Sequence, residues 1–128
     1  MRFLLDTHTF LWASNADPSL SARARRIIED GGNELFVSAA SVWEIAIKVR
    51  LGKLPTGEVL LNDLDTYLAY MGLDGLPMSL SHAARAGALR GEHRDPFDRM
   101  LISQAQVENL PIISNDRIFD AYHVERIW

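Results

Sequence analysis

Phe3-Leu4-Leu5-Asp6, near the start of the sequence, has three consecutive apolar residues that end at a carboxylate. A short apolar run that does not alternate with polar residues is typical of a strand buried on both faces of a parallel sheet. Further strands are predicted at residues 34–37, 73–78, 111–113 and 124–128. Helices are predicted between them, at residues 19–30, 38–51, 58–71, 79–90, 96–108 and 116–122. This alternation predicts an α/β fold in which right-handed crossovers place helices on both faces of a central parallel sheet.

Length and composition restrict the class of protein. The chain has 128 residues, of which 48% are apolar, a formal net charge of −4 and no cysteine. This length fits a single domain over residues 1–128, and the lack of cysteine excludes disulfide scaffolds, thiolate metal sites and cysteine nucleophiles. No stretch approaches the ~18 apolar residues of a membrane span, so we expect a soluble, cytoplasmic protein without a membrane partner. The acidic balance argues against a broad basic surface for nucleic acid, although a bound divalent metal supplies positive charge.

Acidic residues mark a candidate site at one edge of this sheet. Asp6 directly follows the first strand and Asp116 follows the strand at residues 111–113, so both are predicted at the edge where ligands bind in open parallel sheets. Each also suits the N-cap of the helix that follows it. Asp95 and Asp98 flank the start of the helix at residues 96–108. An N-cap role for Asp95 and a favourable helix-dipole position for Asp98 explain both acids without any function.

Glu44 has two interpretations of equal weight. Ser41 and Glu44 have the spacing of a capping box, and Glu44 with Lys48 forms a favourable pair one helical turn apart. The main apolar face of this helix lies opposite Glu44, which favours a solvated charge. Trp43 and Ile47 flank it, however, so the helix is largely enclosed and Glu44 is also placed to point into a cleft.

Converging carboxylates have a specific chemical meaning. Acids that lie within a few ångströms repel one another and resist ionisation. Mg²⁺ or Mn²⁺ between them makes the arrangement favourable, because these cations take carboxylate and water oxygens as ligands. Such a site generates a nucleophile from bound water and neutralises charge on a phosphate. Hydrolysis of a phosphodiester then requires neither a histidine base nor a covalent intermediate.

Four segments, in this order and spacing, carry a recognisable signature. They are Phe3-Leu4-Leu5-Asp6-Thr7-His8, Ser41-Val42-Trp43-Glu44-Ile45, His93-Arg94-Asp95-Pro96-Phe97-Asp98-Arg99-Met100-Leu101-Ile102 and Ile113-Ser114-Asn115-Asp116. Together they span nearly the whole chain, which resembles the PIN domain and, more closely, the VapC-type toxin ribonucleases of toxin–antitoxin pairs. The resemblance implies a three-layer α/β/α sandwich around a parallel sheet and a Mg²⁺- or Mn²⁺-dependent endoribonuclease.

The resemblance also assigns roles to residues of this chain. The acids of the family carry over onto Asp6, Glu44, Asp98 and Asp116, which are expected to hold one or two cations and to be catalytic. Further residues are expected to hold ligands or water, or to steer the phosphate backbone: Thr7, Asp95, Ser114, Lys48, Arg94 and Arg99. Ser114 stands where the family often has Thr and keeps the hydroxyl. Ion pairing with neighbouring acids is the simpler explanation of the basic residues.

The resemblance also implies partners, and two rival functions remain open. A VapC-like toxin implies an RNA substrate, a homodimer and a cognate antitoxin whose tail covers the acidic cleft. A non-catalytic PIN-fold module that binds RNA or protein is the first alternative. A Mg²⁺-dependent phosphatase or receiver-like domain is the second, but a phosphatase of this type needs an Asp two positions after Asp6, where His8 stands.

Aromatic and histidine residues carry no clear functional pattern. Trp12, Trp43 and Trp128 are interpreted as core or interface residues rather than as base-stacking surfaces. The four histidines lack the spacing of a zinc site, which favours structural or surface roles for them: His8, His82, His93 and His123.

Overall fold

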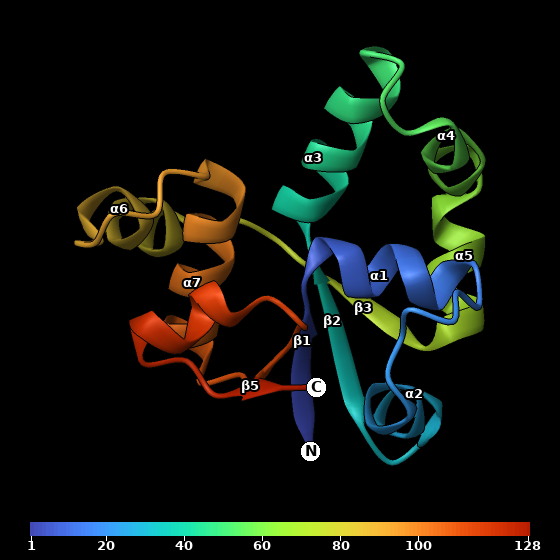
Figure 1. The fold of residues 1–128 in the computed structure, drawn as a ribbon, viewed down its shortest axis with the longest axis horizontal. Coiled ribbons are helices and arrows are strands. Elements are labelled where there is room, and N and C mark those ends of the chain that lie inside the picture. The colour runs from blue at the N-terminus through green and yellow to red at the C-terminus, as the bar shows by residue number, and fades with distance from the viewer.

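The strands form one fully parallel five-stranded sheet in the computed structural model, which describes all of residues 1–128. β1 (Arg2–Leu5) is central, between β2 (Glu34–Ser38) and β4 (Ile112–Ile113), while β3 (Leu73–Leu76) and β5 (Arg126–Ile127) lie at the edges (Figure 1). Because all strands run the same way, the residues that follow them meet at one edge of the sheet.

Helices cover both faces of the sheet, as the three-layer prediction requires. Phe3 and Leu5 point into a core with α1 (Thr7–Ser14) and α2 (Ala22–Glu29). Leu4 points the other way, into a second core with α7 (Pro96–Glu108) and the 3₁₀ helix η1 (Arg117–Tyr122). Figure 1 shows these two groups of helices on opposite sides of the strands. The predicted three-layer α/β/α sandwich is confirmed.

The remaining helices complete the crossovers. They are α3 (Ala39–Arg50), α4 (Pro55–Asn62), α5 (Leu64–Met71) and α6 (Leu80–Ala88). α6 packs against α7, and α3 contacts α1, α4 and α7 from its place directly after β2. α3 therefore stands beside the edge of the sheet where the strands end.

Three helix predictions need correction. The single helix predicted over residues 58–71 is two helices, because Asp63 leaves helical geometry at φ −123° and ψ 35°. The helix predicted over residues 19–30 begins only at Ala22, where Ser21 is the N-cap and accepts a hydrogen bond from the Ala24 N–H. Helix α1, directly after β1, was not predicted.

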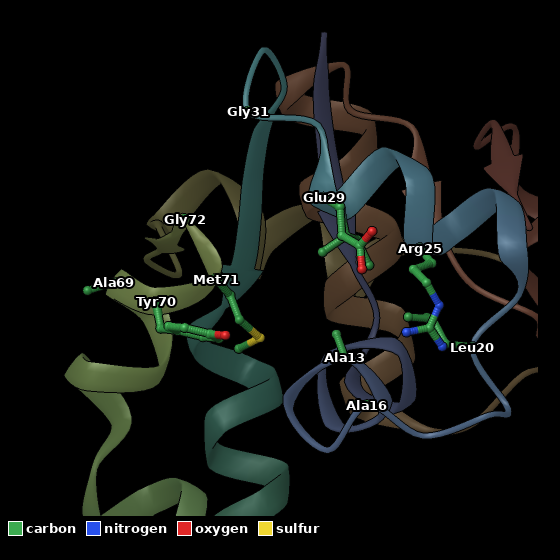
Figure 2. Close-up of a pocket in the computed structure, with 11 residues that line it drawn as sticks. Ala13, Ala16, Leu20, Arg25, Glu29, Gly31, Ala69, Tyr70, Met71 and Gly72 are labelled. Carbon is green, nitrogen blue, oxygen red and sulfur yellow. The ribbon is translucent and has the colours of Figure 1, made fainter.

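A cavity of about 630 Å³ lies between α1, α2 and the end of α5, lined in part by Ala13, Leu20, Glu29 and Tyr70 (Figure 2). Tyr70 precedes β3, so this rim of the cavity lies at the edge of the sheet where the strands begin. Asp6 lies at the opposite edge, where the strands end. None of the helices combines the length and the apolar character that crossing a membrane requires.

Candidate active site

Asp6 is fixed at the end of β1 as the N-cap of α1. Its Oδ1 accepts a hydrogen bond from the Thr9 N–H at 2.8 Å, and its Oδ2 accepts one from the Ser114 hydroxyl at 2.5 Å. The side chain is buried, and this burial raises the pKa of the Asp6 carboxyl, against the lowering effect of both hydrogen bonds. The N-cap interpretation of Asp6 is therefore correct, yet it leaves an acid in an environment that disfavours its own charge.

Glu44 lies in the second turn of α3 and is buried, with 8% of its surface exposed. The Thr7 hydroxyl donates to Glu44 Oε1 at 2.8 Å and shares a second hydrogen bond, of 2.9 Å, with the Ser41 hydroxyl. Lys48 donates to Glu44 Oε2 at 2.7 Å, which confirms the pair one turn apart. The Thr7 hydroxyl, itself hydrogen-bonded to Ser41, thus holds one oxygen of Glu44, while a half-exposed ammonium neutralises the other.

The capping box predicted for Ser41 and Glu44 is wrong. The N-cap of α3 is Ser38, whose hydroxyl accepts a hydrogen bond from the Ala40 N–H at 3.0 Å. Ser41 and Glu44 are interior residues of this helix, and both are buried against the start of α1. Of the two interpretations left open for Glu44, the structure excludes the solvated charge.

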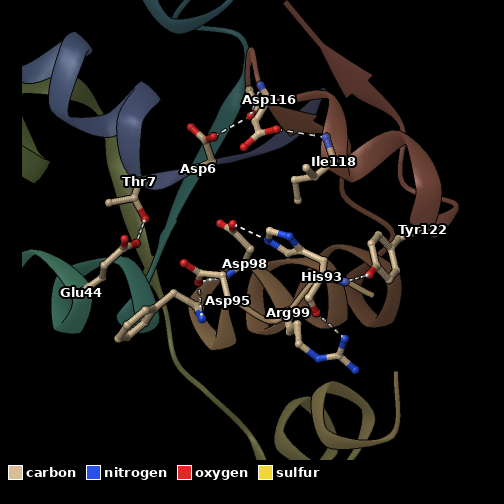
Figure 3. A network of polar contacts seen from close by, with 12 residues as sticks. Asp6, Thr7, Glu44, His93, Asp95, Asp98, Arg99, Asp116, Ile118 and Tyr122 are labelled. Atoms are coloured by element: carbon tan, nitrogen blue, oxygen red, sulfur yellow. Dashed lines mark hydrogen bonds and ion pairs between the residues drawn. The ribbon is translucent and has the colours of Figure 1, made fainter. Parts of the chain in front are cut away.

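Asp98 lies in the first turn of α7. The His93 ring donates from Nε2 to Asp98 Oδ2 at 2.8 Å, since a carboxylate only accepts. Burial raises the pKa of the Asp98 carboxyl, the hydrogen bond from His93 opposes this, and the negative charges of Asp95 and Glu44 raise the pKa further. The acids of α3 and α7 are thus close enough to repel one another, and Figure 3 shows them on the same side of the molecule.

Asp95 and Asp116 lie at the exposed rim of the site. Asp95 is the N-cap of α7 and accepts hydrogen bonds from the N–H groups of Phe97 and Asp98. Asp116 is the N-cap of η1 and accepts from the Ile118 N–H at 3.0 Å. Ser114 links this rim to the interior, because its hydroxyl oxygen accepts the Asp116 N–H at 3.0 Å while it donates to Asp6. Both rim acids have complete structural explanations.

Figure 3 shows the carboxylates of Asp6, Glu44, Asp95, Asp98 and Asp116 around one space, with Thr7 beside Glu44 and His93 beside Asp98. They come from the ends of β1 and β4 and from the starts of α3 and α7. No three acid or histidine side chains converge closely enough to form a metal-binding group. The acids therefore surround a common space without meeting at one point.

The basic residues divide into paired and free side chains. Lys48 is paired with Glu44, and the Arg99 guanidinium donates to the backbone carbonyls of His93 and Leu89. Arg99 thus fixes the loop before α7 and is not presented to a phosphate. Arg94 is exposed and takes part in no ion pair.

His93 is the site residue that sequence reasoning missed. Its ring holds Asp98, its N–H donates to the Tyr122 hydroxyl at 3.3 Å, and its carbonyl accepts from Arg99. The sequence pattern predicted only a structural or surface role for His93 and did not predict its contact with a candidate acid. The signal available in the sequence was the spacing of five positions between His93 and Asp98 across a helix start, which becomes specific only once α7 is placed.

Comparison with known proteins agrees with this geometry. Residues 3–124 match the PIN domain family. The chain is 41% identical over 73 residues to Ribonuclease VapC16 of Mycobacterium tuberculosis, a match that covers 54% of this chain and about half (50%) of that relative.

Solved structures with this fold cover almost all of the chain. VapBC2 from Rickettsia felis, bound to a DNA fragment from its promoter, has a TM-score of 0.75 at 20% identity and covers 99% of this chain and 98% of that one. A toxin–antitoxin complex from Klebsiella pneumoniae has a TM-score of 0.65 at 18% identity and covers 98% and 96%. These two likenesses concern the fold, and the family match extends over nearly all residues. The chain belongs to the PIN domain family.

Proposed function

We propose that this chain is a Mg²⁺- or Mn²⁺-dependent endoribonuclease that hydrolyses RNA phosphodiester bonds. The observation that carries the proposal is that Asp6, Glu44 and Asp98, from three distant segments, face one space at the carboxyl edge of the sheet. The partial identity to Ribonuclease VapC16 supports RNA as the substrate. We expect the chain to act in the cytoplasm, because the proposed substrate is RNA.

The chemistry of the donor set fits a hard divalent cation. The candidate ligands are carboxylate oxygens, and desolvation raises the pKa of both Asp6 and Asp98, so positive charge in the space between them would favour their ionised forms. Asp6, Glu44 and Asp98 are the proposed ligands, and Asp116 contributes from the rim through water. The acids surround the space without converging, so a bound ion would keep several water ligands, as Mg²⁺ prefers.

Each proposed ligand is oriented by its neighbours. Ser114 and the Thr9 N–H hold Asp6, Thr7 and Lys48 hold Glu44, and His93 holds Asp98. A bound cation supplies a water of lowered pKa as the nucleophile and neutralises charge on the phosphodiester. The protein contributes the orientation of the acids, and Arg94 contributes a free positive charge for the RNA backbone.

The direct test is cleavage of a structured RNA by the purified chain. We expect cleavage with Mg²⁺ or Mn²⁺, complete loss with EDTA, and recovery when the metal is restored in excess. Cleavage that persists unchanged in EDTA contradicts the metal-dependent mechanism. Binding of RNA without any cleavage supports the non-catalytic module instead.

His93→Ala is expected to reduce cleavage about tenfold and to raise the Mg²⁺ concentration needed for half-maximal rate, because Asp98 loses the group that orients it. His93→Gln, which retains a donor, should recover part of the loss. His123→Asn is the matched control, since His123 is exposed and its positive φ of 56° is tolerated by Asn. An unchanged Mg²⁺ midpoint in His93→Ala would show that His93 only stabilises the loop.

We also propose that the chain is the toxin of a type II toxin–antitoxin pair and forms a homodimer. The proposed antitoxin presents an Arg or Lys to the carboxylates, since a positive side chain satisfies the same charges as the cation. A small protein with a DNA-binding start in the adjacent open reading frame is the expected finding. If that partner inhibits equally well without its basic residue, this form of inhibition is wrong.

A further inference from the structure

Trp43 is an exposed aromatic residue beside the acids. It directly precedes the buried Glu44 on α3, yet 57% of its surface is exposed, so of the core and interface roles predicted for it the structure excludes the core. Its ring meets the edge of Phe97 with centroids 5.2 Å apart and planes at 76°. Phe97 lies between the two acids at the start of α7, Asp95 and Asp98. The two rings therefore form one aromatic surface joined to two segments of the candidate site.

This aromatic surface borders an apolar cavity of about 300 Å³. The lining side chains come from α3, α6, α7 and the residues before α6, and include Ala40, Trp43, Met78, Ala86, Phe97 and Met100. Met78 is 40% exposed at its margin. A concave apolar space with one open aromatic wall suits a flat ring system better than a charged or flexible group.

A second cavity with a different character also borders the first turn of α7. It encloses about 670 Å³ and has no apolar lining residue: its walls are Gly91, Glu92, His93, Arg94 and Arg99. Arg99 lines both cavities, so they are neighbours around the same turn. The Arg99 guanidinium is held by the backbone carbonyls of His93 and Leu89, whereas the Arg94 side chain is exposed and in no ion pair, so Arg94 supplies the free positive charge of this cavity. This second cavity suits an anion.

We propose that the apolar cavity beside Trp43 and Phe97 binds a nucleobase of the RNA substrate, while Arg94 binds a neighbouring phosphate. This inference rests on the proposed function and adds to it the position of the substrate relative to the acids. Single-stranded RNA alternates flat apolar faces with anionic groups, and the turn that carries Asp95 and Asp98 lies next to one cavity of each kind. Stacking on an aromatic side chain tolerates any base, so this contact positions the strand more than it selects a sequence.

A second copy of the chain is the competing occupant of the same surface. An interface between two copies requires a surface that complements itself about a two-fold axis. The apolar cavity instead shares Arg99 with the second cavity, and two residues of its lining, Trp43 and Phe97, directly precede Glu44 and Asp98 in the chain. This proximity to charged residues of both signs favours a nucleotide over an apolar partner.

The test measures RNA affinity separately from cleavage. In the Asp6→Asn background, a short fluorescein-labelled single-stranded RNA is titrated and its anisotropy recorded. Trp43→Ala is expected to weaken binding about tenfold and Trp43→Phe to stay within about threefold, because Phe retains a stacking face. Tyr70→Ala is the matched control, since Tyr70 is an aromatic residue with 90% exposure at the opposite edge of the sheet, and it should leave affinity unchanged.

A series of RNAs with one abasic ribose each identifies the base. At one position the missing base should weaken binding as much as Trp43→Ala does, and the two changes together should weaken it no further. Unchanged affinity in Trp43→Ala overturns the nucleobase site. So does a loss of self-association in sedimentation with RNA affinity per protomer unchanged, which would assign the surface to a second copy.

The proposed function and this site fail in different ways. Metal-dependent cleavage by the parent protein together with an unaffected Trp43→Ala variant leaves the function and removes the nucleobase site. RNA binding that depends on Trp43 without any cleavage leaves the nucleobase site and removes the nuclease. If the parent protein does not cleave RNA and neither it nor the Asp6→Asn protein binds RNA, both are wrong.

Discussion

Asp6→Asn and Asp98→Asn are each expected to reduce RNA cleavage by at least about a thousandfold, because each removes a charge that the proposed cation requires. Asn has nearly the same shape as Asp. At position 6 it remains a good N-cap for α1, so the Thr9 N–H keeps its acceptor. Burial disfavours the charge of Asp6, so the neutral side chain should leave the melting temperature unchanged or higher. The measurements are initial cleavage rates at saturating Mg²⁺ and thermal melting of the same preparations.

Asp65→Asn is the matched control, because Asp65 is an exposed acid on α5 with no hydrogen bond to the site. It should cleave RNA at the parent rate. The double variant Asp6→Asn with Asp98→Asn should be no more than slightly slower than either single variant, since one missing ligand already disables the site. Cleavage that survives in the double variant would refute the metal-dependent mechanism.

The position of the candidate site could be predicted from the sequence because it depends on strand direction. Asp6 and Asp116 follow apolar runs separated by helices, and parallel strands bring such residues to one edge. Ser114 joins the two in the structure through hydrogen bonds with Asp6 and with the Asp116 N–H. Local rules also placed the N-caps at Asp95 and Asp116 correctly, since each involves only the next three residues.

The environment of Glu44 could not be predicted, because helical periodicity assumes that one face of a helix is buried by one neighbour. α3 contacts α1, α4 and α7, so Glu44 is buried although it lies opposite the main apolar stripe. Trp43 shows the reverse, an aromatic residue left exposed beside a buried acid. Which side of α3 is covered depends on the long crossovers that place α1 and α7.

The missed helix and the missed break have separate causes. α1 carries apolar, aromatic and β-branched residues without a clear amphipathic stripe, since it is enclosed between the sheet, α3 and the end of the chain at Trp128. The break at Asp63 interrupts an apolar pattern that continues through Leu61, Leu64 and Leu68, all of which pack on the same core. Periodicity reports the face that is buried and does not report whether the backbone is continuous.

Thr7→Val should reduce cleavage by between about ten- and a hundredfold and raise the Mg²⁺ concentration for half-maximal rate by about tenfold. Val keeps the branched shape of Thr at the start of α1 but removes the hydroxyl that donates to Glu44 Oε1. Without that donor Glu44 is oriented by Lys48 alone, whose ammonium is half-exposed and competes with a cation for the same carboxylate. Groups that orient a metal-binding carboxylate typically contribute effects of this size.

A second variant, Thr7→Ser, separates the orientation of Glu44 from the folding stability of the protein. Thr7→Val leaves the buried Ser41 hydroxyl and Glu44 short of a hydrogen bond, which costs about 1–3 kcal/mol of folding free energy, so a lower melting temperature alone says nothing about orientation. Thr7→Ser retains the hydroxyl and should keep the Mg²⁺ midpoint of the parent, even though it loses a methyl group from the packed start of α1. A midpoint shifted equally in both variants, or in neither, would mean that the Thr7 hydroxyl does not orient Glu44 for the ion.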